Sequence, residues 1–167
     1  MPDYMKNVLD ASPDEIVWYF SFISFTAPLS GVIVGGIITS KFGGYNTVSS
    51  QKFQCYMGVC AMLSCLPCPF ISEIKYFGTC IWLLLFFGGI MLPPVTGIML
   101  NSVEDNQKTS ANSLANMSYN MVGYMPAPFF YGFISLWTGG PSSRWPMGFL
   151  LYSSIFTMLL LVVALRQ

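Results

Sequence analysis

Five apolar stretches without a charged residue constrain this chain more than any other feature. They cover residues 17–40, 53–71, 77–100, 111–136 and 146–165, and all seven Lys/Arg and all seven Asp/Glu lie outside them. A helix of ~20 apolar residues crosses the hydrocarbon core of a bilayer. Charged residues make up only 8% of the chain, against about 25% in a soluble domain. The sequence therefore predicts an all-α integral membrane protein with five transmembrane helices.

The chain divides into an acidic N-terminal flank, residues 1–16, and a five-helix transmembrane domain, residues 17–167. The flank has no basic start followed by an apolar run, so we do not expect it to be a secretory signal. Ser12-Pro13-Asp14-Glu15 is typical of a helix start, with a serine cap, an early proline and acidic residues in the first turn. The domain is expected to begin just after this cap.

An odd number of membrane helices places the two termini on opposite sides of the membrane. We expect the loops 41–52 and 101–110 on the same side as the C-terminus. Four basic residues then lie on that side and three on the other, which weakly assigns the first side to the cytoplasm or matrix. The two sets are Lys41, Lys52, Lys108 and Arg166, and Lys6, Lys75 and Arg144. The sequence predicts a multi-pass protein without fixing its membrane, and an organellar membrane such as the mitochondrial inner membrane is one candidate.

Composition excludes several functional classes. Acidic and basic residues balance, so no nucleic-acid partner is expected. The chain has no histidine, the commonest metal ligand and general base. Cys65-Leu-Pro-Cys68 has the C-x-x-C spacing but no second pair, and we interpret the five cysteines as packing residues. We expect no enzyme activity, metal or cofactor, because no Cys/His, Ser/His or paired-carboxylate arrangement is present.

The segment 31–45, GVIVGGIITSKFGGY, combines small residues with a predicted turn. Gly31, Gly35 and Gly36 give a smooth helix surface, which favours close helix packing in lipid. We expect Gly35 and Gly36 at such a contact, with the stretch 53–71 as the neighbour. Gly43-Gly44 should turn the backbone. Proline kinks are expected at Pro28, Pro93, Pro94, Pro126 and Pro128.

A polar stripe follows one face of the stretch 111–136. At about 100° per residue, Asn112, Asn116, Asn120 and Tyr124 share this face, with Tyr119 at its edge. Such a stripe must avoid lipid. It either binds neighbouring helices through an asparagine ladder or lines a cavity that contacts solute. Further residues on the polar face are Gly123, Ala127 and Tyr131, and the opposite face carries Leu114, Met117, Met121, Met125 and Pro128.

Several of these segments resemble the major facilitator superfamily of transporters. The spacing Gly36-x-x-x-Ser40-Lys41-x-Gly43 resembles the family's loop signature, with Ser40 in place of the acidic residue and Gly44-Tyr45 in place of two basic residues. Residues 92–100 (LPPVTGIML), 111–115 (ANSLA) and 123–132 (GYMPAPFFYG) are similar to helices ten and eleven of the spinster and organic-anion type. On this alignment the five stretches are helices eight to twelve. The chain then supplies neither the first half nor helix seven.

Two functions follow from the resemblance and the stripe. In the first, the chain is part of a transporter for a small organic solute or lipid, which would contact Asn112, Asn116, Asn120 and Tyr124. It would need a separately encoded first half or a homo-oligomer mate. In the second, it is a degenerate transporter half that serves as a structural subunit of a larger membrane complex. The charge-free stretches count against proton-coupled transport by this chain alone.

Overall fold

The computed structural model describes residues 1–45, 47–140 and 142–164, with helices and no strand among them. The predicted all-α class is therefore confirmed. The α-helices are α1 (Pro2–Asn7), α2 (Pro13–Lys41), α3 (Val48–Cys65), α4 (Ile74–Asn101), α5 (Lys108–Ser118), α6 (Pro126–Trp137) and α7 (Trp145–Ala164). Two 3₁₀ turns, η1 (Cys68–Phe70) and η2 (Asp105–Gln107), precede α4 and α5, and a π-helical segment, η3 (Tyr119–Tyr124), joins α5 to α6.

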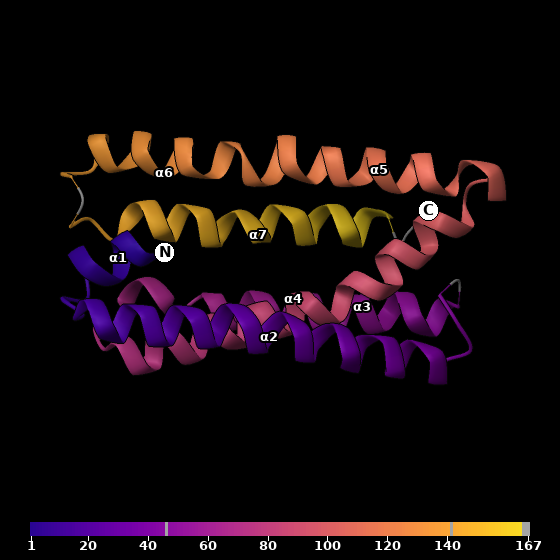
Figure 1. Ribbon diagram of the computed structural model, residues 1–167, viewed down its shortest axis with the longest axis horizontal. Coiled ribbons are helices and arrows are strands. Elements are labelled where there is room, and N and C mark those ends of the chain that lie inside the picture. The colour runs from indigo at the N-terminus through magenta and orange to yellow at the C-terminus, as the bar shows by residue number, and fades with distance from the viewer. Residues whose placement is uncertain (46, 141, 165–167) are drawn as a thin grey trace.

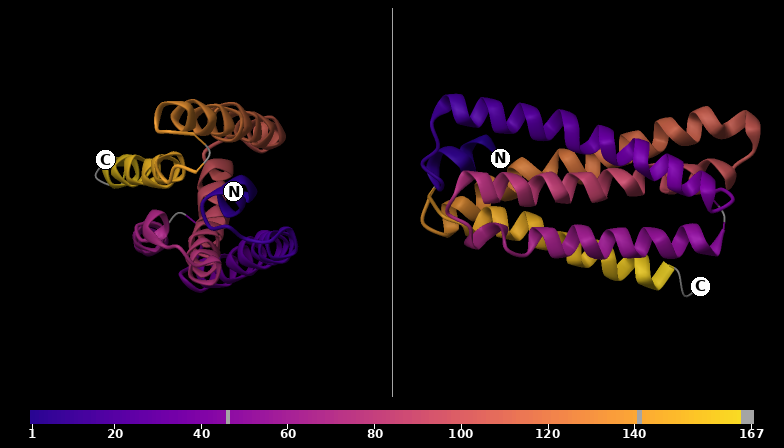
Figure 2. Two further views of the ribbon diagram at one scale, coloured as in Figure 1. Left: turned by 90° about the vertical axis from the view of Figure 1, so that its left-hand side faces the viewer. Right: turned by 90° about the horizontal axis from the view of Figure 1, so that it is seen from below.

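The helices form five roughly antiparallel rods, one for each apolar stretch (Figure 1). Helices α2, α3 and α4 pack together, while α7 and the continuous α5–η3–α6 rod lie on the other side (Figure 2). The short helix α1, the start of α2 and the turn η1 lie at one end of the bundle, which we call the α1 end (Figure 1). The α2–α3 and α4–α5 connections lie at the opposite end.

Among the described residues, three helical segments are long and apolar enough to cross a membrane: Pro13–Lys41, Ser49–Phe70 and Ile74–Asn101. The first begins with a complete capping box, in which the Ser12 hydroxyl accepts from the Glu15 backbone N–H and the Glu15 carboxylate accepts from the Ser12 N–H. The helix start expected at residues 12–15 is therefore confirmed. Pro28, Pro93 and Pro94 lie inside helices that continue through them. The second half of α4, which carries Pro93 and Pro94, rises away from α2 toward α5 (Figure 1).

Glycines bring α2 and α4 into backbone contact. A methyl group on Gly31 would collide with the Phe86 carbonyl oxygen, and one on Gly35 with the Ile90 carbonyl oxygen. Gly89 of α4 faces back toward α2, since a Cβ there would lie 2.9 Å from the Pro28 carbonyl oxygen. This corrects the expectation for Gly35 and Gly36: the neighbour is α4 rather than α3, and Gly36 has no heavy atom within 4 Å of its Cβ position. Consecutive helical residues point about 100° apart, so only one of the pair can face α4.

The N-terminal flank contributes a helix to the core. Tyr4 and Met5 of α1 are 0% exposed. The ring of Tyr4 stacks on Phe77 of α4, with 5.1 Å between centroids. Helix α1 lies between the α2–α4 side and the α7 side of the bundle (Figure 2). Its cluster also includes Ile23, Cys65, Cys68, Ile81, Met147 and Leu151.

Candidate functional site: a polar stripe on an exposed helical rod

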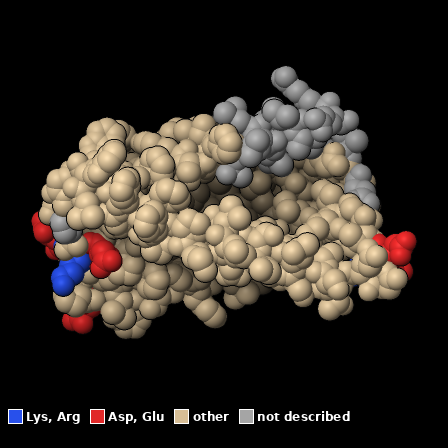
Figure 3. Space-filling model, turned by 90° about the horizontal axis from the view of Figure 1, so that it is seen from above, with Lys and Arg blue, Asp and Glu red and all other residues tan. Residues whose placement is uncertain are grey.

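Charged side chains gather at the two ends of the bundle. On the face shown in Figure 3, coloured charges lie at both ends and uncharged surface lies between them. Acids outnumber bases at the α1 end, and bases outnumber acids among the described residues at the opposite end. The α1 end carries Asp3, Lys6, Asp10, Asp14, Glu15, Glu73, Lys75 and Arg144, and the opposite end carries Lys41, Lys52, Glu104, Asp105 and Lys108.

Three tryptophans mark the α1 end. Trp18 lies in the second turn of α2, Trp137 ends α6 and Trp145 begins α7, and they are 76%, 80% and 71% exposed. Tyr76, in the first turn of α4, is also exposed. We call these four residues the aromatic belt. Tryptophan and tyrosine are enriched where a membrane protein passes from hydrocarbon to headgroups, so the belt has the composition of a membrane–water boundary.

The polar stripe of the sequence lies on the exposed α5–η3–α6 rod. Neither α5 nor η3 contains a buried residue. The side chains of Asn112, Asn116, Tyr119, Asn120 and Tyr124 are all exposed. The amide of Asn120 donates to the backbone carbonyl of Asn116 at 2.7 Å, a bond within the helix itself. No described helix buries the stripe, and its amide and hydroxyl groups are open to a molecule outside this part of the chain.

The apolar face of the rod is exposed as well. Leu114, Met117, Met121 and Met125 are each more than half exposed. The rod therefore presents a polar face and an apolar face, and neither is covered by the described residues. The rod packs against the rest of the bundle mainly where α6 contacts α7.

A π-helical segment interrupts the stripe. The Met125 N–H donates to the Asn120 carbonyl oxygen at 2.9 Å, five residues earlier. A π turn holds more residues than an α turn, so the residues after it rotate relative to those before it. Asn112 and Asn116 lie in α5 before the π segment, and Asn120 lies inside it, with its amide on the Asn116 carbonyl. The residues of α6 follow the π segment and are offset from the face that a regular helix predicts. Sequence periodicity could not show this change.

The segment expected to carry the loop signature ends α2 and turns the chain. Ser40 donates its hydroxyl to the Gly36 carbonyl oxygen at 2.9 Å, inside its own helix, and Lys41 is the last residue of α2. Gly43 and Gly44 have φ angles of 85° and 108°, which glycine adopts readily, and they turn the chain as expected. Ser40 cannot supply the negative charge that an acidic residue would give this loop.

One hydrogen bond between helices was not apparent from the sequence. The Trp82 indole N–H of α4 donates to the Thr26 hydroxyl of α2 at 2.9 Å, and Thr26 donates to the Phe22 carbonyl oxygen at 2.7 Å. On α3, the hydroxyl of Ser50 and the amide nitrogen of Gln54 are buried without a partner among the described residues. Fifty-six residues separate Thr26 from Trp82, so no local pattern pairs them.

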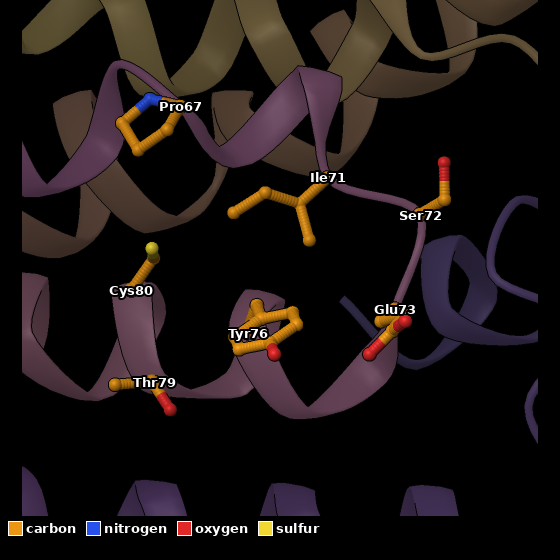
Figure 4. A pocket seen from close by; sticks show the side chains of 7 residues that line it. All are labelled: Pro67, Ile71, Ser72, Glu73, Tyr76, Thr79 and Cys80. Carbon is orange, nitrogen blue, oxygen red and sulfur yellow. The ribbon is translucent and has the colours of Figure 1, made fainter.

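Among the described residues, surface pockets lie near the α1 end between η1 and α4 and between α6 and α7. The first, of about 570 Å³, is lined by Pro67, Ile71, Ser72, Glu73, Tyr76, Thr79 and Cys80 (Figure 4). The second, of about 630 Å³, is lined mainly by Ile134, Trp145, Phe149, Tyr152 and Phe156. Among the described residues, no group of three or more His, Cys, Asp or Glu side chains is placed to hold a metal ion.

Comparison with known proteins gives no relative: no protein family, no curated protein and no solved structure matches this chain.

Proposed function

We propose that this chain supplies five membrane-spanning helices to a major-facilitator-like transporter of a small organic solute. The polar stripe Asn112, Asn116 and Asn120 then faces the solute pathway. The observation that carries this proposal is the exposure of the stripe along a rod that runs the length of the bundle.

Membrane insertion is supported by the distribution of polar and apolar surface. Large apolar side chains are exposed along α2, including Phe22, Phe25, Leu29, Ile33 and Ile37. The described charges are confined to the two ends, and the aromatic belt lies at one of them. Basic residues favour the cytoplasmic or matrix side, and the five-span topology expected from the sequence puts four of them on the side opposite α1 and three on the α1 side. That end is therefore assigned to the cytoplasm or matrix.

The stripe supports a pathway because amide groups at membrane depth cannot face lipid without losing their hydrogen bonds. They require a wet cavity or polar groups of another helix. Transporters with two related halves bind solute near the midplane between those halves. A first half, encoded separately or supplied by a second copy of the chain, would cover the rod and enclose such a cavity. Amides and hydroxyls without charge suit a neutral or anionic solute.

The alternative function is that of a structural subunit in a larger membrane complex without transport activity. Two observations favour it: Ser40 replaces the acidic residue of the loop signature, and both faces of the α5–η3–α6 rod are exposed. In that setting the stripe would be buried against a neighbouring subunit. Its asparagines would then donate to and accept from that neighbour.

The double variant Asn116→Ala with Asn120→Ala separates the two functions, and Asn106→Ala in the η2 turn is its matched control. The variants would be compared in proteoliposome uptake of labelled monocarboxylates, sugars and lysophospholipids, and in co-purification from mild detergent. A transporter loses uptake and keeps its partners. A structural subunit loses partners, because each buried group left unpaired costs about 1–3 kcal/mol. If both readouts are unchanged, the stripe supports neither function.

A further inference from the structure

The pocket between η1 and α4 combines an apolar slot with the Glu73 carboxylate at its rim, and Arg144 donates a hydrogen bond to the rim residue Ser72. We propose that it binds a zwitterionic phospholipid of the phosphatidylcholine or phosphatidylethanolamine class, with the headgroup at the rim and the start of an acyl chain in the slot. This inference goes beyond the proposed function. It requires membrane insertion, but it does not require transport.

The slot is apolar where it lies deepest between the two elements. In Figure 4, Ile71 points into the space between η1 and α4, and Pro67 and Cys80 face each other across its far side. The Thr79 hydroxyl is already used, since it donates to the Lys75 carbonyl oxygen of its own helix at 2.9 Å. The interior of the pocket therefore suits an acyl chain better than a polar solute.

A carboxylate and a guanidinium group flank Ser72 at the rim. Glu73 lines the pocket, is exposed, and makes neither a cap hydrogen bond nor an ion pair among the described residues. Arg144 donates to the Ser72 hydroxyl at 2.9 Å and to the Phe70 carbonyl oxygen at 3.4 Å. A guanidinium group has five N–H donors, so Arg144 keeps donors for a phosphate. An anion and a cation are thus both tied to Ser72, Glu73 as the next residue and Arg144 through a hydrogen bond.

This arrangement is complementary to a zwitterionic headgroup. The ammonium group pairs with the Glu73 carboxylate, and the exposed ring of Tyr76 adds a cation–π surface beside it. The phosphate pairs with Arg144, since guanidinium groups bind phosphate with good geometry. An anionic phospholipid without an amine would leave Glu73 facing negative charge. The rim therefore selects against it.

The depth of the pocket identifies a bilayer lipid as the source of this headgroup. Tyr76 belongs to both the pocket and the aromatic belt, and Trp145 directly follows Arg144 in the chain. Belt residues lie at headgroup level. The charged rim consequently lies at the membrane surface, while the slot between η1 and α4 opens to the hydrocarbon side. A free phosphorylated amine would satisfy the rim but leave the slot unfilled.

Lipid titration followed by native mass spectrometry tests the assignment. The full chain in mild detergent would be titrated with phosphatidylcholine, phosphatidylglycerol or free phosphocholine. We expect retention of phosphatidylcholine above the other two. Glu73→Gln should weaken phosphatidylcholine binding about tenfold, the factor that corresponds to about 1.4 kcal/mol, and should reduce the preference over phosphatidylglycerol. Glu104→Gln, an exposed acid at the opposite end, is the matched control and should bind as the parent does.

Two further variants keep the test independent of folding. Tyr76→Leu preserves an apolar side chain and should weaken phosphatidylcholine binding alone. Arg144→Lys preserves the charge but loses the planar donor pair, and should weaken binding of both phospholipids. Equal retention of phosphatidylcholine and phosphatidylglycerol by the parent, or unchanged binding by Glu73→Gln, would overturn the proposal. Retention of phosphocholine as strong as that of the lipid would assign the rim to a soluble ligand instead. None of these readouts depends on solute uptake.

Discussion

Gly35 of α2 lies against the carbonyl group of Ile90 in α4, so closely that a single added methyl group would meet the α4 backbone. Gly31 makes the equivalent contact with Phe86 one helical turn earlier. In lipid, helices associate through packing and hydrogen bonds rather than through the hydrophobic effect, and small residues permit that packing. The α2–α4 contact is accordingly sensitive to any added side-chain volume.

Alanine at position 35 should destabilise the protein, because the colliding atoms belong to the backbone of α4 and cannot rotate away. We expect a loss of about 1–3 kcal/mol in the free energy of unfolding, the usual cost of overpacking. Thermal unfolding in detergent would measure it. Gly36→Ala is the control, since that position has free space and should leave stability unchanged or slightly higher. Equal effects of the two variants would contradict the α2–α4 contact.

The bond between Trp82 and Thr26 should contribute measurable stability. Hydrogen bonds between membrane helices average about 0.6 kcal/mol and reach about 1.7 kcal/mol. We expect Thr26→Val and Trp82→Phe each to lower the free energy of unfolding by an amount in this range. The double variant should lose less than the sum, because both changes remove the same bond. Thr79→Val is a suitable control, since the Thr79 hydroxyl donates only within its own helix.

The core position of Tyr4 leads to opposite expectations for two substitutions. Tyr4→Ala removes the stacked ring and should cost about 3–5 kcal/mol, as aromatic truncation in a core does. Tyr4→Phe keeps the ring and removes a buried hydroxyl that has no partner among the described residues, so stability should stay equal or rise. Chemical or thermal unfolding distinguishes them. A loss with Tyr4→Phe would mean that the hydroxyl has a partner outside the described chain.

Alkaline pH should weaken the packing of Tyr4 against Phe77. Burial raises the pKa of Tyr4 above its ordinary value of 10.0. The stability that the buried, neutral Tyr4 contributes is therefore fully present below pH 10.0, the ordinary pKa. It is lost as the pH rises from there through the raised pKa of the folded state. The parent should therefore lose more stability than Tyr4→Phe between neutral and strongly alkaline pH. Parallel profiles for the two proteins would contradict the burial of Tyr4.

The topology can be checked with single cysteines in a cysteine-free background. Ser49→Cys and Asn106→Cys lie near the two connections at the end opposite α1 and should be labelled from one side of the membrane. Ser142→Cys, between α6 and α7, should be labelled from the other side. Labelling of Ser49→Cys and Asn106→Cys from opposite sides would contradict both the five-span topology and the family alignment.

The positions of α2 and α4 could be predicted from the sequence because each helix follows a long apolar stretch. The stretch 77–100 lies within α4 (Ile74–Asn101), and the stretch 17–40 lies within α2 (Pro13–Lys41). Packing partners could not be predicted in this way. Gly35 and Gly36 are equivalent in a composition argument, and only the rotation of α2 against α4 distinguishes them.

Sequence reasoning missed the core helix α1 and the π turn in the candidate site for different reasons. Helix α1 is too short to give a periodic signal, and Tyr4 and Met5 become core residues only through contacts with distant helices. The π turn at 119–124 arises from a local change of hydrogen-bond partner, which residue types do not encode strongly. The periodicity of 3.6 residues applies to Asn112 and Asn116 in the regular helix α5, whereas Asn120 and Tyr124 lie in the π segment, where that periodicity changes.

Water accessibility of the stripe tests the central claim most directly. Cysteines placed one at a time at Asn112, Asn116 and Asn120, and at Leu114, Met117 and Met121 as controls, would be treated with a charged methanethiosulfonate reagent in proteoliposomes. The account predicts rapid labelling at the three asparagine positions and little at the three apolar positions, which would face lipid or protein. Equal labelling of both faces, or labelling of the apolar face alone, would contradict a solute pathway along this rod.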